Sequence, residues 1–72
     1  MFMSAGEKIR LIARRKNMSI ADLSRELNTS NQNLFNKLKR DNFTEEDLKE
    51  IAAVLGCTVD TIFTDIETGE KI

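Results

Sequence analysis

The chain has 72 residues, which fits a single domain with a small buried core. It contains one cysteine and no histidine, so an intrachain disulfide and a His/Cys zinc site are excluded and a reducing compartment is favoured. Its net charge is −1, but the charges are unevenly distributed along the chain. Residues 1–40 carry nine Lys and Arg against three acids, and residues 41–72 carry two Lys against nine acids. This asymmetry predicts a cationic face opposite an anionic one.

The first predicted helix covers about residues 5–16. Ser4 followed three residues later by Glu7 can form a capping box, in which each side chain bonds the backbone of the other residue. The apolar residues Ile9 and Ile12 follow at helical spacing. This stretch also carries a run of cations, which we interpret either as a solvated face or as an electrostatic footprint beside a nucleic acid.

A second, short helix is predicted at about residues 20–27. Ser19 and Asp22 repeat the capping pattern of the first helix. Asn28 follows the last residue of the helix, and asparagine tolerates the left-handed conformation that a tight turn requires. We therefore expect the chain to turn sharply at this residue.

The third predicted helix, at about residues 30–40, has an unusual composition. Its N-cap is Thr29 or Ser30, and with Thr29 as the cap, Gln32 would complete a capping box. Leu34 and Leu38 are four residues apart and can face the core together. The remaining positions are rich in amides and cations, which indicates either a polar surface helix or a helix that offers donor and acceptor pairs to adenine.

The fourth predicted helix covers about residues 45–55. Thr44 is its expected cap, and acids fill its first turn, where the helix dipole favours negative charge. Gly56 is suited to end the helix. The tail, residues 58–72, is rich in β-branched and aromatic residues, so we favour a β-hairpin over a short fifth helix. In either form we expect the tail to contribute to a homodimer.

The stretch SIADLSRELNTSNQNLFNKLK, with the turn at Asn28 in its centre, resembles the helix-turn-helix of phage-repressor and Cro-type regulators, also called the XRE family. The resemblance covers roughly residues 5–56. It implies a mainly α, compact four-helix repressor-like domain that binds double-stranded DNA and places the helix at residues 30–40 in the major groove.

The resemblance also implies roles for individual residues. Amides on the helix at residues 30–40 would read base edges, and cations and hydroxyls around it would contact phosphates. The predicted base-reading residues are Asn31, Gln32, Asn33 and Asn36. The predicted phosphate contacts are Ser19, with the backbone N–H groups of Ser19 and Ile20, and Ser30, Lys37, Lys39, Arg40 and Asn42. Arg14 and Lys16 are further candidates beside the groove.

The chain departs from the family pattern at several positions. Ile20 stands where many members carry a DNA-contacting Gln, so we expect that contact to be absent. Lys37 takes a position that is usually apolar and Leu38 follows it, which predicts that the core contact has moved by one residue. The same change removes the expected partner of Arg10 in the family's buried Arg–Glu pair. Phe35 is either a half-buried packing residue or an apolar contact to a thymine methyl group.

These patterns favour a sequence-specific DNA-binding regulator, most plausibly a repressor. The alternative is an antitoxin-like or adaptor module that binds a protein partner through the acidic C-terminal half. The sequence has no apolar run of about 18 residues and no signal peptide, so we expect a cytoplasmic protein without a membrane partner. Without histidine, a Gly-rich phosphate loop or a nucleophile elbow, we expect no enzyme activity, no cofactor and no metal.

Overall fold

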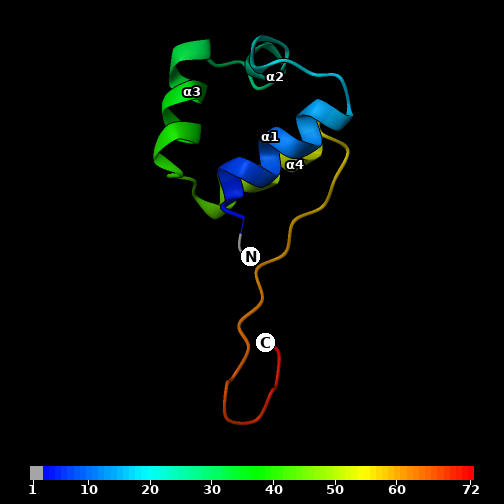
Figure 1. The fold of residues 1–72 in the computed structure, drawn as a ribbon, viewed down its shortest axis with the longest axis vertical. Helices are drawn as coiled ribbons and strands as arrows, with labels where there is room; N and C mark the ends of the chain where they lie inside the picture. The colour runs from blue at the N-terminus through cyan, green and yellow to red at the C-terminus, as the bar shows by residue number, and fades with distance from the viewer. Residues whose placement is uncertain (1–2) are drawn as a thin grey trace.

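The computed structural model describes residues 3–72, which form four α-helices and no sheet. The helices are α1 (Ala5–Arg15), α2 (Ile20–Glu26), α3 (Asn31–Arg40) and α4 (Glu45–Val54). Their ends lie within one residue of the predicted ones. Figure 1 shows the four helices gathered into one helical body, with the C-terminal tail extending away from it. Every helix within residues 3–72 is too short and too polar for a transmembrane segment.

Each helix begins after a hydroxyl side chain that accepts a hydrogen bond from the N–H of the third helical residue. The four caps are Ser4, Ser19, Ser30 and Thr44. Capping boxes close at α1, α2 and α4, where the third residue is an acid. At α3 the cap is Ser30 and not Thr29, so the box predicted for Gln32 does not form.

Left-handed backbone conformations end the helices where the sequence predicted them. Asn28 has φ 57° in the turn between α2 and α3, and Gly56 has φ 70° after α4. Asn17 and Asp41 also adopt positive φ, at 55° and 54°, after α1 and α3. Asn, Asp and Gly are the residues that tolerate this region, so a short polar residue or glycine marks the end of each helix.

The core is a single cluster of aliphatic side chains to which all four helical segments contribute. Its buried members are Ile9, Ala13, Leu23, Leu34, Leu38, Ile51 and Leu55. Ser24 is buried among them at 1% exposure, and its hydroxyl donates a hydrogen bond of 2.7 Å to the carbonyl oxygen of Ile20. Because that donor is satisfied inside its own helix, the buried hydroxyl does not weaken the core.

The start of α1 and the end of α3 touch directly. The Gly6 N–H donates a hydrogen bond of 2.7 Å to Oδ1 of Asp41, the residue that caps α3. A Cβ at Gly6 would lie 3.0 Å from the Leu38 carbonyl oxygen, so only glycine allows this approach without displacement. The contact fixes the position of α3 against α1.

The tail differs from the predicted β-hairpin. Thr64 and Lys71 form an isolated bridge, and Phe63 and Ile72 exchange two backbone hydrogen bonds of 3.0 and 2.8 Å around a turn at Gly69. No strand and no fifth helix forms in the described residues. The propensity of the residues for strands is realised only in this small closed turn, because a two-stranded pairing without a packing surface is marginal.

Candidate nucleic-acid interface

Helix α3 turns a polar face away from the core. Leu34 and Leu38 point inward and are 2% and 6% exposed. Gln32 and Asn36, also four residues apart, lie on the opposite side, because successive helical side chains are separated by about 100°. The Gln32 amide Nε2 donates a hydrogen bond of 3.2 Å to Oδ1 of Asn36. Two of the residues predicted to read bases therefore form a connected pair on the outward face.

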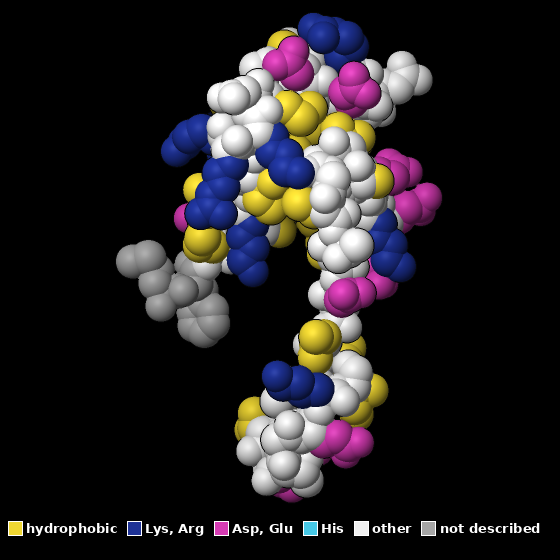
Figure 2. All heavy atoms as spheres, turned by 90° about the vertical axis from the view of Figure 1, so that its right-hand side faces the viewer, with side chains coloured by type: hydrophobic (Ala, Val, Ile, Leu, Met, Phe, Trp, Pro, Cys, Tyr) yellow, Lys and Arg dark blue, Asp and Glu magenta, His cyan; other side chains and the backbone are white. Residues whose placement is uncertain are grey.

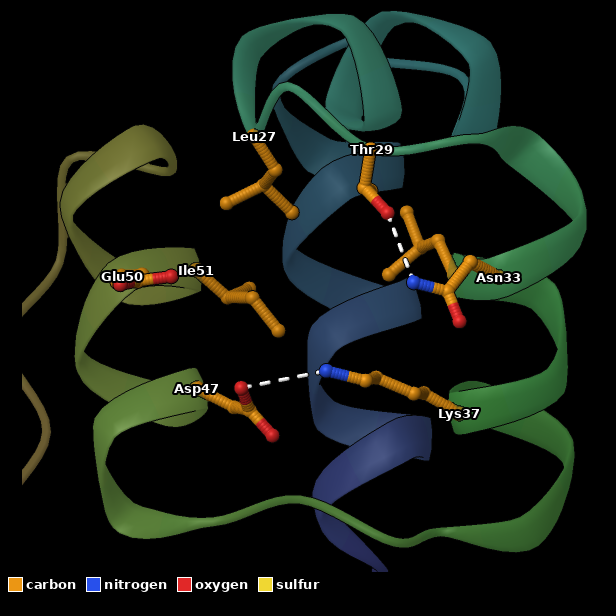
Figure 3. Close-up of a pocket in the computed structure, with 8 residues that line it drawn as sticks. Leu27, Thr29, Asn33, Lys37, Asp47, Glu50 and Ile51 are labelled. Carbon is orange, nitrogen blue, oxygen red and sulfur yellow. Dashed lines mark hydrogen bonds and ion pairs between the residues drawn. The ribbon is translucent and has the colours of Figure 1, made fainter.

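The other two predicted base-reading residues lie differently. Asn31 is exposed at the first position of α3. The Asn33 Nδ2 donates a hydrogen bond of 2.9 Å to Oγ1 of Thr29 (Figure 3). The Asn33 backbone N–H donates one of 3.0 Å to Oγ of Ser30. The backbone N–H and the side-chain amide of Asn33 therefore both bond residues just before the first turn of α3. A base contact by Asn33 stays a prediction, and the side-chain oxygen and the second amide hydrogen remain for it.

The cations at the end of α3 are of two kinds. Lys39 and Arg40 are exposed. Lys37 instead extends toward α4, where its Nζ lies 3.2 Å from Oδ1 of Asp47 (Figure 3). Leu38 is buried in its place, which confirms the predicted shift of the core contact by one residue. The phosphate contact predicted for Lys37 stays a prediction for a side chain that already has a partner.

The Lys37 partner is also the capping acid of α4. The Thr44 N–H donates a hydrogen bond of 3.0 Å to Oδ2 of Asp47, while Lys37 bonds Oδ1. The backbone hydrogen bond from Thr44 is the main cause that holds the pKa of Asp47 below its usual value, and Lys37 lowers it further against the opposing effect of burial. One carboxylate therefore begins α4 and ties it to α3.

Half of the predicted contact residues line one shallow surface hollow of about 240 Å³. They are Asn33, Asn36, Lys37, Arg40 and Asn42. Amides supply paired donors and acceptors, and cations supply the charge that phosphates attract. The outward side of α3 and the loop after it therefore combine the two kinds of group that duplex DNA requires.

Ser19 lies apart from this hollow, and the phosphate contact predicted for it stays a prediction. It lines a separate hollow of about 260 Å³ together with Arg10 and Arg14. Its backbone N–H, predicted to hold a phosphate, donates a hydrogen bond of 2.9 Å to Oδ2 of Asp22. This hydrogen bond is the main cause that lowers the pKa of Asp22 below its usual value. A phosphate contact at Ser19 would therefore fall to its hydroxyl group.

Three residues, Phe35, Arg10 and Asp41, make contacts that the sequence analysis did not predict. Phe35 is 44% exposed on α3, and Cζ of Arg10 lies 6.0 Å from its ring centroid, which is a cation–π distance. Arg10 takes part in none of the ion pairs found within the described residues. Asp41 holds the end of α3 through Gly6. The positive φ of Asp41 could have been expected of an aspartate that follows a helix, but its bond to Gly6 could not.

Charge is segregated on the surface. Figure 2 shows one face on which Lys and Arg gather mostly along one side of the helical body and Asp and Glu mostly along the other. The last turn of α3 holds three cations and its first turn holds no acid, whereas the first turn of α4 holds three acids. Within the described residues, no three or more His, Cys, Asp or Glu side chains are grouped so that they could hold a metal ion.

A family model described as a Cro/C1-type HTH DNA-binding domain matches residues 8–68. The match includes all of α2, α3 and α4, most of α1 and the greater part of the tail. Searches of curated proteins and of solved structures found no match.

Proposed function

Since the chain belongs to the Cro/C1-type family of helix-turn-helix DNA-binding domains, we propose that it is a sequence-specific transcriptional regulator that represses by covering promoter DNA. Helix α3 lies in the major groove, with its outward face toward the base edges. Two copies read the two halves of an inverted repeat. The DNA-binding role and the lone cysteine both favour the cytoplasm as its location.

The outward face of α3 is the observation that carries this proposal. Gln32 and Asn36 present amides that match the N6 and N7 groups of adenine in a bidentate pair. The hydrogen bond between them holds the two side chains together before DNA arrives, which reduces the ordering that binding requires. Asn31 adds a third amide at the start of the same helix. Base reading is therefore assigned first to these three residues.

The electrostatics of α3 favour an anionic partner at both of its ends. The first turn carries no acid, so the positive end of the helix dipole is not neutralised by a side chain. Lys39 and Arg40 lie exposed at the other end, beside Asn42 in the following loop. These groups would hold phosphates on either side of the bases and set the register of the helix in the groove. Ser30 and Lys37 are assigned as secondary phosphate contacts, since both already make intramolecular bonds.

A selection from random-sequence duplex DNA tests the proposal. The purified protein is allowed to bind the pool, and the bound DNA is sequenced after several rounds. We expect an enriched inverted repeat with half-site centres about 10 base pairs apart. The matched control is the double variant Gln32→Ala and Asn36→Ala, which keeps every core residue and should enrich no sequence. A random pool from the unmodified protein would rule out base reading.

A second candidate function is a protein-binding module, which the exposed apolar tail favours. Ile66 and Ile72 are 97% and 79% exposed, whereas the large aliphatic side chains of the four helices are buried or half-buried. The two functions separate on the double variant Lys39→Ala and Arg40→Ala. If the variant loses DNA binding but still regulates its target genes in cells, the protein-binding role is favoured. Loss of both together supports the regulator.

A further inference from the structure

Lys37 lines two hollows of the surface. The smaller hollow, of about 70 Å³, lies between α3 and α4 and is also lined by Asp47 and Glu50. The larger is the hollow of about 240 Å³ on the outward side of α3, which Lys37 shares with Arg40 and Asn42. The Lys37 ammonium group points toward α4 (Figure 3). One flexible side chain therefore borders both a contact between two helices and the proposed DNA-binding surface.

The ion pair between Lys37 and Asp47 is suited to exchange. The two side chains are 39% and 23% exposed, and Nζ lies 3.2 Å from Oδ1. A partly exposed pair of this kind contributes little to stability, because water and salt screen the two charges. Asp47 has a second bond, since its Oδ2 accepts a hydrogen bond of 3.0 Å from the Thr44 N–H. The carboxylate therefore keeps its position and one hydrogen bond when the lysine leaves.

The other two cations in the last turn of α3 are not restrained in this way. Lys39 and Arg40 are exposed, and neither takes part in an ion pair found among the described residues. Of the three cations, Lys37 alone is paired within that part of the chain. A phosphate that binds Lys37 must therefore compete with the Asp47 carboxylate, whereas Lys39 and Arg40 can meet a phosphate directly.

We propose that Asp47 is an intramolecular competitor of DNA, which holds the Lys37 ammonium group in the free protein and releases it to a phosphate when DNA binds. This inference rests on the proposed DNA-binding function and adds to it a residue of α4 that limits affinity. Carboxylate and phosphate oxygens both accept charge-assisted hydrogen bonds from an ammonium group, so the exchange replaces one such bond by another. The binding-competent lysine is only fractionally available, which lowers the affinity for any duplex.

The substitution Asp47→Asn tests the competition. The asparagine oxygen can still accept the Thr44 N–H, but the neutral amide no longer attracts the ammonium group. Binding to random-sequence duplex, measured by fluorescence anisotropy, should strengthen about two- to fivefold, because exposed ion pairs shift equilibria by about this factor. The matched control is Glu50→Gln, which removes an equal charge from the same hollow without breaking an ion pair of Lys37. An equal gain in both variants would reduce the effect to net charge and overturn the inference.

The substitution Lys37→Met removes the ammonium group and keeps an apolar side chain of similar length. In this background Asp47→Asn should no longer strengthen binding, because the two substitutions act on one interaction. Lys37→Met alone should lower the slope of log affinity against log salt by about one unit. An unchanged slope would show that Lys37 stays with Asp47 in the complex, and a gain from Asp47→Asn without Lys37 would show that no competition exists. Either result overturns the inference.

Nitrogen-15 spectra of the lysine ammonium groups follow the exchange directly, with Lys37→Met identifying the Lys37 signal. In the free state the signal should differ between the unmodified protein and Asp47→Asn, and saturating random duplex should bring the two signals to one position. A Lys37 signal that duplex leaves unchanged, in a protein that binds the duplex, would overturn the inference and leave the proposed DNA-binding function standing. If the unmodified protein binds no duplex, the proposed function fails and the inference fails with it.

Discussion

Helices α3 and α4 are built alike and carry opposite chemistry. Each has ten residues, begins after a hydroxyl cap and contributes aliphatic side chains to the same core. Helix α4 fills its first turn with three acids, as its dipole favours, whereas α3 begins with uncharged amides and ends with three cations. A hydroxyl cap is thus sufficient to begin a helix, and the first turn does not need acids for the helix to form.

The largest expected effect comes from the core, where the two helices should behave identically. Leu34→Ala in α3 and Leu55→Ala after α4 should each lower the free energy of unfolding by about 2–5 kcal/mol, because both side chains are 2% exposed and their removal leaves a cavity. Urea unfolding followed by circular dichroism measures the loss. Lys39→Ala, an exposed control, should change it by less than about 0.5 kcal/mol. A decrease in the free energy of unfolding of less than about 1 kcal/mol at either leucine would show that the two helices do not contribute equally to the core.

Substitutions on the outward faces of the two helices should differ in their effect on DNA binding. Gln32→Ala in α3 should weaken binding to the selected operator by about 1–3 kcal/mol, roughly 5- to 150-fold, and leave binding to random duplex unchanged. Glu46→Ala, an exposed position of α4, is the matched control and should affect neither. Fluorescence anisotropy with both duplexes is the measurement. Equal losses on operator and random DNA would remove Gln32 from base reading.

The pH dependence of stability should come from α4 more than from α3. The pKa of Asp47 is lowered in the folded state, so its contribution is present above the unfolded value of about 3.9 and is lost as the pH falls through the folded value. Asp47→Asn should cost about 1 kcal/mol or less near neutral pH and flatten the acid limb of the stability curve. Urea midpoints between neutral pH and about pH 3 test this. An unchanged acid limb would mean that the bonds from Thr44 and Lys37 add no stability.

The smallest expected effect separates two lysines. Lys39→Ala should reduce the slope of log affinity against log salt by about one unit, because one phosphate contact is lost. Between 50 and 200 mM salt this amounts to about a threefold difference in affinity. Lys49→Ala removes a cation of α4 whose Nζ lies 3.7 Å from Glu45, and it should leave the slope unchanged. The same salt slope for both variants would show that Lys39 of α3 makes no phosphate contact.

The helices could be predicted because their signals are local. A hydroxyl residue with an acid three positions later determines where α1, α2 and α4 begin, and Asn28 and Gly56 end helices through their own backbone preferences. The tail could not be predicted in this way. Its strand propensity depends on a surface to pack against, and the tail extends away from the helical body (Figure 1).

The site was predictable in its composition and not in its contacts. The amides and cations of α3 could be read from the sequence, as could the burial of Leu38 in place of Lys37. The bonds from Lys37 to Asp47 and from Asn33 to Thr29 join segments or neighbours whose approach depends on side-chain conformation. The Gly6–Asp41 bond spans 35 residues, so no local pattern announces it.

The hydrogen bond between Gln32 and Asn36 has a consequence for divergence. Both partners belong to the outward face of α3, and neither side chain is bonded to another helix in the described structure. If α3 reads bases as proposed, replacing them would alter what the helix recognises without disturbing Leu34, Asp41 or the cap at Ser30. Related copies of such a gene could acquire new target sites through a few substitutions on this face, while the inner face keeps the fold unchanged.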